Sequence, residues 1–493
     1  MTPGWNAFWT AIAITQMAGS AAVTVHVLLH RRSPVSSSAW IGLAWLAPGF
    51  GAILYVLLGV NRIERRGRRL HRRQLAAPDE PACTAIAPAH LIPLGRAATA
   101  ITGRSMLAGN HVAPLLHGDE AYPAMLRAIA GATTSIALSS YIFRADTSGR
   151  HFIAALAAAV ARGVAVRVLI DGFGGGFFNA GAWRQLRRAG VPSARFLHSP
   201  LPWRMPLLNL RSHKKLLVVD GLVGFAGGLN IGDENLDPGR PKRPLLRLRR
   251  RGIRDMHFRV EGPVVGQMMA AFAEDWDFAA GEELQGPAWF PPGAAAVTTP
   301  GPTPGPTPGP TPGPTLARVA TSGPDHELER IKLLKMSALT TARHRIRVMT
   351  PYFLPDDALA STLALAALRG TRVEILVSAR SDHKLLDWAM RDGLIAMAEA
   401  GCDVQWSQPP FNHTKLMTID GAWCLVGSAN WDMRSLRLNF ELDIELRDPE
   451  LTARLDALID ATPSRPVGLH ELRNRTLAIR LRDAAARLLL PYL

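Results

Sequence analysis

The chain has 493 residues, and its 56 lysines and arginines against 40 acidic residues give a formal net charge of +16. Hydrophobic residues make up 48% of the sequence, which excludes an intrinsically disordered chain, because such chains cannot bury enough apolar surface to fold. The three cysteines, Cys83, Cys402 and Cys424, are far apart in the chain. They exclude a disulfide-stapled fold and a zinc site built on cysteines.

Two apolar stretches at the start of the chain, residues 8–29 and 38–60, carry no formal charge. About 20 apolar residues suffice to cross a bilayer, so each stretch is long enough. They predict a two-helix transmembrane hairpin, with the first helix and a link at 1–37 and the second helix at 38–60. A signal peptide is the alternative for the first stretch, but no basic side chain precedes it and it is longer than a typical signal core.

Residues 61–110 are predicted to be a basic juxtamembrane segment. Seven arginines lie between residues 61 and 73, against Arg31 and Arg32 in the link. The positive-inside rule therefore places residue 61 onward in the cytoplasm. This predicts a multi-pass protein of the cell inner (cytoplasmic) membrane whose soluble domains face the cytoplasm. Beside an anionic leaflet each arginine also adds about 1 kcal/mol of attraction.

A repeat of Thr, Pro and Gly between residues 299 and 315 divides the soluble part of the chain. Proline lacks the amide donor that helices and sheets need, so the segment 291–318 is predicted to be an extended linker. It separates a first domain at 111–290 from a second at 319–493, the latter including a C-terminal tail.

Each domain shows the order strand, helix, strand, which predicts an α/β layer architecture. In the first domain these elements are predicted at 135–143, 151–161 and 164–170, and in the second at 345–353, 356–368 and 371–377.

Both domains contain the same motif, offset by 200 residues. The eighteen residues from His213 read HKKLLVVDGLVGFAGGLN, those from His413 read HTKLMTIDGAWCLVGSAN, and seven positions are identical. Residues two apart in a strand point to the same face, so His213 projects with Lys215, and His413 with Lys415. A lone His-x-Lys would mean little, but two copies in duplicated surroundings favour a catalytic function.

The aspartates of the two motifs, Asp220 and Asp420, each precede a glycine between two apolar runs. This is the signal of a hairpin turn, so the pattern alone indicates turn-formers or anchors.

After each turn, a second strand ends in a small pair and an asparagine. Small residues let a ligand approach the backbone, and amide or hydroxyl groups supply neutral hydrogen-bond donors. The predicted substrate-binding residues are Gly228, Asn230, Ser428 and Asn430.

Joining the halves would gather two imidazoles, two ammonium groups and two amides, without a set of metal ligands. Such a site suits a phosphodiester, whose non-bridging oxygens the lysines and asparagines neutralise, and no metal or cofactor is predicted. One histidine can attack phosphorus while the other protonates the leaving alcohol and deprotonates the incoming one. Two downstream acids in strand-like runs, Asp255 and Glu441, are predicted to orient the histidines.

The two motifs match H-x-K-x4-D, the signature of the phospholipase D superfamily, and with the membrane segments the chain resembles the bacterial cardiolipin synthases. The resemblance implies two duplicated α-β-α sandwich domains sharing one active site. It implies that two phosphatidylglycerol molecules are joined into cardiolipin with release of glycerol. It makes His213 the nucleophile and His413 the general acid and base, and it counts Asp220 and Asp420 as catalytic members.

Two other functions stay open from the sequence: a membrane-bound hydrolase that releases phosphatidic acid, and a catalytically dead basic lipid-binding protein. The predicted partners are anionic phospholipids (phosphatidylglycerol, cardiolipin) and the bilayer, and no nucleic acid; the oligomeric state is left open. A basic insert at 240–254 holds eight Lys or Arg. It is either a dock for anionic head groups or a solvated loop.

Overall fold

The computed structural model describes residues 3–29, 34–56, 88–176, 180–198, 210–236, 252–292, 313–324 and 327–488. The arginine cluster at 61–73, residues 240–251 of the basic insert and most of the predicted linker lie outside these residues. The chain divides into two compact units, Met1–Arg72 with Ser199–Asn209, and Arg73–His198 with Leu210–Leu493. Each unit is described by itself.

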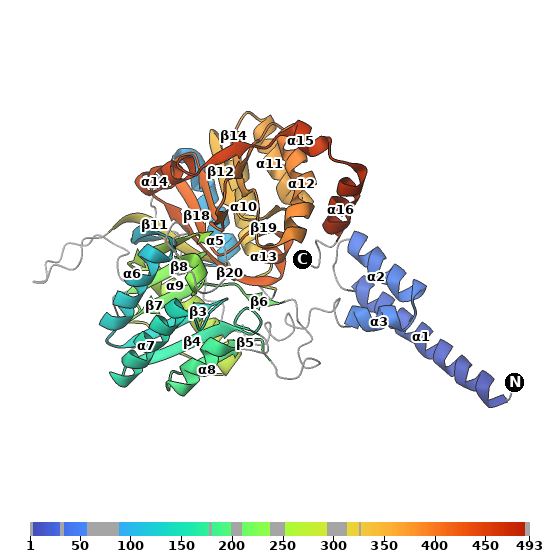
Figure 1. Cartoon of the computed structure of the whole chain (residues 1–493), viewed down its shortest axis with the longest axis horizontal. Helices are drawn as coiled ribbons and strands as arrows, with labels where there is room; N and C mark the ends of the chain where they lie inside the picture. Colours follow the sequence, from blue (N-terminus) through green and yellow to red (C-terminus); the bar gives the residue numbers. More distant parts are fainter. Residues whose placement is uncertain are drawn as a thin grey trace, which may run out of the picture. The chain divides into compact units, whose positions relative to one another are not determined.

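The first unit holds the helices α1 (Pro3–Leu29), α2 (Pro34–Leu46) and α3 (Phe50–Leu54) (Figure 1). Helix α2 packs against α1, and the Ser20 hydroxyl donates to the carbonyl of Ala44 at 2.5 Å. Among the described residues only one helix is long and apolar enough to cross a membrane, at Ala7–Leu29 with a mean hydropathy of 1.6.

The predicted second transmembrane helix at 38–60 is wrong. Helix α2 ends at Leu46, because Pro48 has no amide hydrogen to donate and disfavours helical backbone at the residue before it. Gly49 then turns the chain with a φ of 84°. At about 1.5 Å per residue, the 13 residues of α2 extend about 20 Å, short of a hydrocarbon core of about 30 Å. The hairpin is thus corrected to a single apolar helix, and a multi-pass arrangement is not supported.

The first domain is a seven-stranded sheet in the order β2-β10-β8-β7-β3-β4-β5, in which β3, β4 and β5 run parallel. Helices α6, α7 and α8 cover one face, where Ile136 and Leu138 of β3 join their apolar cluster. The alternate residue, Ala137, is buried outside that cluster, and α9 packs against β3, β5 and β7. The strands are β2 (His111–Leu116), β3 (Ser135–Ser140), β4 (Ala165–Asp171), β5 (Ser193–Phe196), β7 (Leu216–Val219), β8 (Val223–Gly227) and β10 (Met256–Glu261). The helices are α6 (His117–Gly131), α7 (Thr147–Ala161), α8 (Gly181–Arg188) and α9 (Val264–Ala280).

The second domain is built on a sheet in the order β1-β11-β20-β18-β17-β12-β14-β15-β21, with β6 added beside β20. Its strands are β1 (Leu107–Gly109), β6 (Arg211–Ser212), β11 (Gly313–Ser322), β12 (Arg345–Thr350), β14 (Arg372–Ser378), β15 (Asp403–Ser407), β17 (Leu416–Ile419), β18 (Trp423–Gly427), β20 (Asn439–Arg447) and β21 (Ser464–Pro466). Its helices are α5 (Ile92–Thr102), α10 (Arg330–Thr341), α11 (Asp357–Leu368), α12 (Lys384–Glu399), α13 (Met433–Arg437), α14 (Pro449–Asp460), α15 (Leu469–Arg473) and α16 (Leu477–Leu488).

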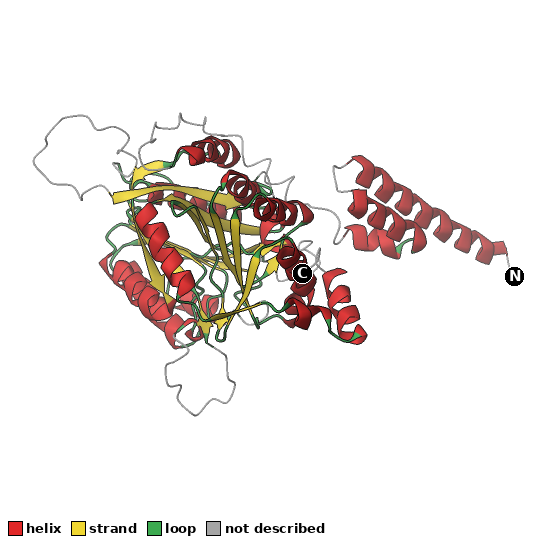
Figure 2. Ribbon diagram, turned by 90° about the horizontal axis from the view of Figure 1, so that it is seen from above, coloured by secondary structure: helices red, strands yellow, loops and turns green. Residues whose placement is uncertain are grey.

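Two segments lie elsewhere than the sequence analysis placed them. Residues 313–318, assigned to the linker, form the beginning of the buried strand β11. Helix α5 and strand β1, assigned to the juxtamembrane segment, belong to the second domain, where α5 packs on α10 and β1 pairs with β11. Both sheets belong to the second compact unit, and helices surround them (Figure 2).

The two domains exchange short strands. Strand β6 of the first half pairs in parallel with β20 of the second, and β16 (Phe411–Asn412) pairs in parallel with β9 (Ile253–Arg254) of the first half. The residue after each exchanged strand is a motif histidine. The amide of His213 donates to the carbonyl of Phe440 at 2.8 Å, and the amide of His413 donates to the carbonyl of Arg254 at 2.7 Å. Both motif histidines are therefore fixed to the opposite half of the chain.

Candidate active site

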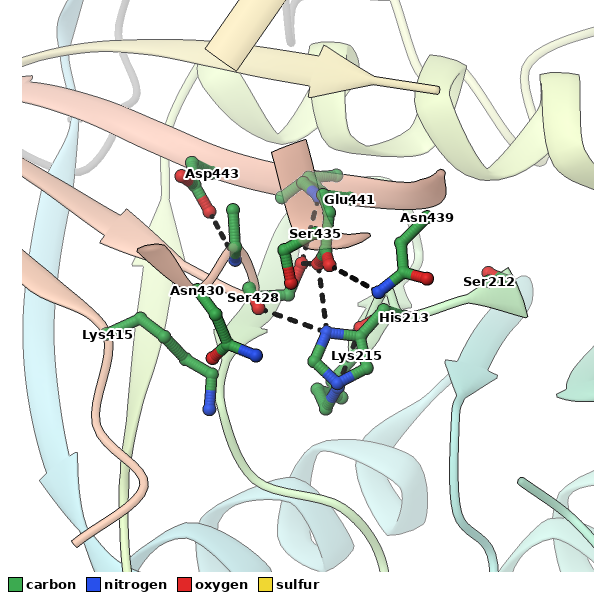
Figure 3. Close-up of polar contacts among 12 residues, drawn as sticks. Ser212, His213, Lys215, Lys415, Ser428, Asn430, Ser435, Asn439, Glu441 and Asp443 are labelled. Atoms are coloured by element: carbon green, nitrogen blue, oxygen red, sulfur yellow. Dashed lines mark hydrogen bonds and ion pairs between the residues drawn. The ribbon is translucent and has the colours of Figure 1, made fainter. Parts of the chain in front are cut away.

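His213 is held from behind by the second domain. Its Nδ1 atom lies 3.0 Å from Oε2 of Glu441 and 3.1 Å from the carbonyl oxygen of Ser428 (Figure 3). Both partners are acceptors, so Nδ1 carries the proton and donates it. Glu441 is fully buried and also accepts from the Ser428 hydroxyl at 2.5 Å and from the Asn439 amide at 3.1 Å. This tautomer leaves the lone pair on Nε2, on the opposite side of the ring.

His413 is held in the same way by the first domain. Its Nδ1 atom lies 2.7 Å from Oδ2 of Asp255, which is buried between β9 and β10. The other carboxylate oxygen of Asp255 accepts the amide of Met256 at 2.7 Å. Each of the two acids predicted to orient the histidines thus contacts the motif histidine of the other half.

The two motif lysines are buried beside the histidines. The ammonium of Lys215 donates to the carbonyl of His213 at 2.7 Å, and that of Lys415 donates to the carbonyl of His413 and lies 2.7 Å from its Nδ1. Burial lowers the pKa of Lys215 to about 7, with Glu441 opposing the shift and Lys415 adding to it. Burial likewise lowers the pKa of Lys415 to about 8, against the pull of Asp255. Two ammonium groups whose pKa values burial lowers would both be stabilised by an anionic ligand.

The histidines and their carboxylates differ between the halves. Burial, and then the charge of Lys215, hold the pKa of His213 well below its ordinary value of 6.5. Burial and Lys415 lower the pKa of His413, but Asp255 opposes that shift. Burial raises the pKa of Glu441, whereas Lys415 and His413 outweigh burial and lower the pKa of Asp255. Asp255 is therefore the firmer anion of the two.

The two motif asparagines accept hydrogen bonds from neighbouring residues. The carbonyl of Asn230 accepts the hydroxyl of Tyr122 at 2.6 Å, and its side-chain oxygen accepts the amide of Ile142 at 3.1 Å. The carbonyl of Asn430 accepts the ammonium of Lys335 at 3.4 Å. Figure 3 shows the side chains of Lys415 and Asn430 extending toward the space beside the His213 ring.

Gly228 and Ser428 occupy a different place from the predicted one. A β-carbon on Gly228 would lie 2.2 Å from Oδ1 of Asp255, so glycine is needed there to leave room for the carboxylate. The Ser428 hydroxyl is bonded to Glu441, and its carbonyl to His213. Both residues support the carboxylates behind the histidines.

The aspartates of the motifs lie at the far ends of the hairpins. Asp220 adopts a left-handed φ of 53° and accepts the amides of Thr133, Thr134 and Ser135 at 2.9, 2.8 and 2.9 Å. At about 3.3 Å per strand residue, five residues separate it from Lys215 by about 17 Å. The contacts make Asp220 an anchor of the turn, as the turn signal indicated, and they do not support the catalytic assignment implied by the resemblance.

Asp420 repeats this arrangement in the second half. It adopts a φ of 51° and accepts the amides of Arg343, His344 and Arg345 at 2.9, 2.8 and 2.7 Å. The ring of His90 adds a fourth contact at 2.7 Å. Its catalytic assignment is likewise unsupported by the contacts.

Two tyrosines near the histidines were missed by sequence reasoning. Tyr141 meets His213 edge-on with ring centroids 5.0 Å apart, and the Lys215 ammonium lies 5.3 Å from the Tyr141 centroid. Tyr352 meets His413 edge-on at 6.4 Å, and its hydroxyl donates to Asp382. Both tyrosines follow equivalent strands, β3 and β12, so aligning the two halves beyond the motif would have found them.

No group of three or more His, Cys, Asp or Glu side chains that could hold a metal ion occurs in the part of the chain that the structure describes.

The family described as "Cardiolipin synthase, PLD-like domain" matches residues 125–242 and 336–462, one stretch in each half. The cardiolipin synthase of Geobacillus thermodenitrificans is 31% identical over 479 residues, covering 95% of this chain and 91% of that one. The chain belongs to the cardiolipin synthase family. The resemblance inferred from the two motifs is confirmed, and with it a phosphatidyltransferase of the phospholipase D type.

A second curated relative and a solved structure are also similar to this chain. Cardiolipin synthase A of Pseudomonas fluorescens strain Pf-5 is 33% identical over 389 residues, covering 78% of this chain and 76% of that one. The crystal structure of phosphatidylserine synthase from Haemophilus influenzae covers 81% of this chain and 100% of its own, with a TM-score of 0.61 and 15% identity. That likeness shows the fold: two phospholipase D-like domains.

Replacing Asp220 with asparagine tests the anchoring function. Asparagine tolerates the left-handed backbone but binds three amides more weakly, so we expect a lower melting temperature, with transferase activity at low temperature within about threefold of wild type. The backbone amides lower the pKa of Asp220 against the effect of burial. Its stabilisation is therefore present above the unfolded pKa of about 3.9 and is lost as pH falls through the folded pKa. The melting difference should shrink below about pH 4; a hundredfold loss of activity with unchanged melting would instead make Asp220 catalytic.

Proposed function

We propose that the chain joins two phosphatidylglycerol molecules into cardiolipin and glycerol, in one active site that the domains 111–290 and 319–493 build together. The observation that carries this proposal is the crossed pair of hydrogen bonds, His213 to Glu441 and His413 to Asp255. Two imidazoles, each held by a buried carboxylate and each with a buried lysine beside it, form a site for one phosphodiester.

In the first step, Nε2 of His213 attacks the phosphorus of the donor lipid. The imidazole is neutral at pH 7 because its pKa is held low, and Glu441 stabilises the ring as it becomes positive. The N–P bond forms, the P–O bond to glycerol breaks, and His413 gives its proton to the leaving oxygen. The ammonium groups of Lys215 and Lys415 and the Asn230 and Asn430 amides stabilise the charge on the non-bridging oxygens.

In the second step, His413 takes the proton from the terminal hydroxyl of the acceptor phosphatidylglycerol. The oxygen so formed attacks phosphorus, the N–P bond breaks, and both histidines return to their starting states. The assignment of acid and base to His413 is supported by Asp255, which stays an anion and stabilises an imidazolium through the shorter of the two hydrogen bonds.

Products formed in phosphatidylglycerol vesicles test the proposal as a whole. The full-length protein is expected to release cardiolipin and glycerol in equal amounts. Phosphatidic acid with free glycerol would identify a hydrolase, and unchanged lipid would identify a dead lipid-binding protein; either result overturns the proposal.

A donor with a better leaving group separates the two histidines. Phosphatidyl-p-nitrophenol releases an anion that needs no proton, so His413→Asn should give one rapid equivalent of p-nitrophenol per chain and then stall. With phosphatidylglycerol the same variant should lose about 10²- to 10⁴-fold in rate. His213→Asn should show no burst with either substrate, since the nucleophile is gone.

The carboxylate variants serve as matched controls for this experiment. Asp255→Asn should follow His413→Asn, keeping the burst, and Glu441→Gln should slow the burst itself. A burst in His213→Asn but not in His413→Asn would reverse the assignment.

The pH dependence follows from the same groups. Below the depressed pKa of His213 the nucleophile is protonated, so kcat/KM should fall only well below pH 6.5. As pH rises, His413 loses the proton that it must donate, and it does so below pH 6.5 because its pKa is lowered. Lys215 and then Lys415 lose their charge through about 7 and about 8 in the free enzyme, so kcat/KM should fall again. A bound phosphodiester raises both lysine pKa values, so the alkaline fall of kcat should lie at higher pH. Profiles in mixed micelles measure this; a kcat/KM flat from pH 5 to 9 would contradict it.

We also propose that α1 anchors the protein in the cell inner membrane with its catalytic domains in the cytoplasm. Arg31 and Arg32 follow α1 directly, seven arginines follow between residues 61 and 73, and no Lys or Arg precedes the helix. With one span, the positive-inside rule still places these arginines and the domains inside. A green fluorescent protein fused after Leu493 should fluoresce in cells and alkaline phosphatase fused there should be inactive; the opposite pair of results would contradict the proposal.

A further inference from the structure

Helix α16 is firmly attached to the second domain through one side. Asp483 is buried and accepts from Arg391 at 3.2 Å, from Arg482 at 2.7 Å and from Arg475. The guanidinium of Arg482 lies 4.3 Å from the centroid of Trp388. These contacts join α16 to α12, so α16 packs on the domain in a fixed orientation.

The other side of α16 is apolar and exposed. Leu477, Leu481 and Leu488 are 70%, 61% and 78% exposed. At 3.6 residues per turn they point within about 40° of one another and form one stripe along the helix. Arg480 and Arg487 flank this stripe on one edge, and the single acid of the helix, Asp483, is buried on the other side. The outward face therefore combines leucine and arginine without a negative charge.

The contacts also fix the direction of α16. Arg475, just before the start of α16, pairs with Asp392 of α12. Farther along, Arg482 of α16 covers Trp388, which is nearer the start of α12. The helices are thus antiparallel, and the end of α16 that carries Leu488 points toward the beginning of α12.

The beginning of α12 lies at the rim of the site. The helix starts directly after His383, whose ring is 6.2 Å from that of Tyr352, the tyrosine that meets His413. Leu385, in the first turn of α12, is 41% exposed. The leucine and arginine face therefore leads to the entrance of the proposed active site.

We propose that this face of α16, together with Leu385, docks on an anionic membrane surface and holds the rim of the site at the level of the lipid head groups. Leucines on one face with flanking arginines are the composition of helices that lie in a bilayer interface. Basic side chains there are attracted to anionic lipids, which complements the charge of phosphatidylglycerol. The inference rests on the proposed function for the identity of that lipid. A second copy of the chain, equally basic on this face, is a poorer match for it.

A probe on the stripe tests the docking directly. The full-length Cys83→Ser protein, whose Cys402 and Cys424 are buried, is labelled with an environment-sensitive fluorophore at Ala484→Cys, on the outer face of α16. It is placed in phosphatidylcholine nanodiscs with or without phosphatidylglycerol, and quenched by lipids that carry a nitroxide near the head group. Quenching at Ala484→Cys is expected in discs that contain phosphatidylglycerol. Arg480→Glu should weaken it by about fivefold, and Arg487→Glu similarly.

Helix α11 supplies the matched control. Leu368, at its last residue, is 72% exposed, and the next strand begins at Arg372, paired with Arg345 beside the Asp420 turn, at the far end of the domain from the site. A probe at Leu368→Cys should stay unquenched. Equal quenching at both positions, or none at either, overturns the docking proposal, and so does a probe response at Ala484→Cys that depends on protein concentration in detergent.

An activity measurement separates docking from the proposed reaction. Changing Leu477, Leu481 and Leu488 to glutamine should lower the ratio of the rate on phosphatidylglycerol vesicles to the rate on soluble short-chain phosphatidylglycerol by about fivefold or more. Leu365→Gln with Leu368→Gln should leave that ratio unchanged. An unchanged ratio in the α16 variant contradicts docking. Quenching without any cardiolipin from the wild type would contradict the proposed function and leave docking standing.

Discussion

Each motif histidine forms a hydrogen bond with a carboxylate that belongs to the other half of the chain. Nδ1 of His213 contacts Glu441, and Nδ1 of His413 contacts Asp255. The exchanged strands β6 and β16 supply the backbone bonds that keep these contacts in register. A buried carboxylate is costly unless it is hydrogen-bonded, and each acid adds the histidine of the other half to the donors that it has in its own half. Both motif histidines are thus held by contacts between the halves, and a half alone would have neither contact.

The halves are related but not equivalent, and the difference matters for the reaction. Behind His213 stands a glutamate whose pKa is raised by burial, and behind His413 an aspartate whose pKa is lowered. The halves also differ two residues after each of these acids. After Glu441, Asp443 accepts the amide of Ala429 at 3.0 Å. After Asp255, the corresponding residue is His257, and burial lowers its pKa to about 4. In the proposed mechanism one histidine must be neutral to attack and the other charged to donate a proton, and unlike surroundings favour that division.

Sequence reasoning predicted what depends on local pattern. The duplicated motif follows from comparing the two halves, and the α/β layers follow from the order of the elements. The turn-forming interpretation of Asp220 came from its place before a glycine. Which carboxylate contacts which histidine depends on strand exchange between residues that lie 228 and 158 positions apart, and no local pattern encodes that.

The predictions that differ from the structure concern features that depend on three-dimensional packing. The lack of charges in residues 38–60 predicted one long transmembrane helix. Pro48 interrupts it, so two short helices form instead. Gly228 and Ser428 look like a ligand-binding pair, but the space that their small side chains leave is occupied by Asp255 and Glu441. The burial of these two acids depends on the folded structure and cannot be inferred from the local sequence.

The most direct test of the central claim is to locate and count the covalent intermediate. The wild-type protein is mixed with phosphatidylglycerol labelled at phosphorus, quenched rapidly in alkali, where phosphohistidine survives, and digested into peptides. If both halves build one centre with His213 as its nucleophile, no more than one label per chain will be found, all of it on the peptide that contains His213. Label on the His413 peptide, or two labels per chain, would contradict the account.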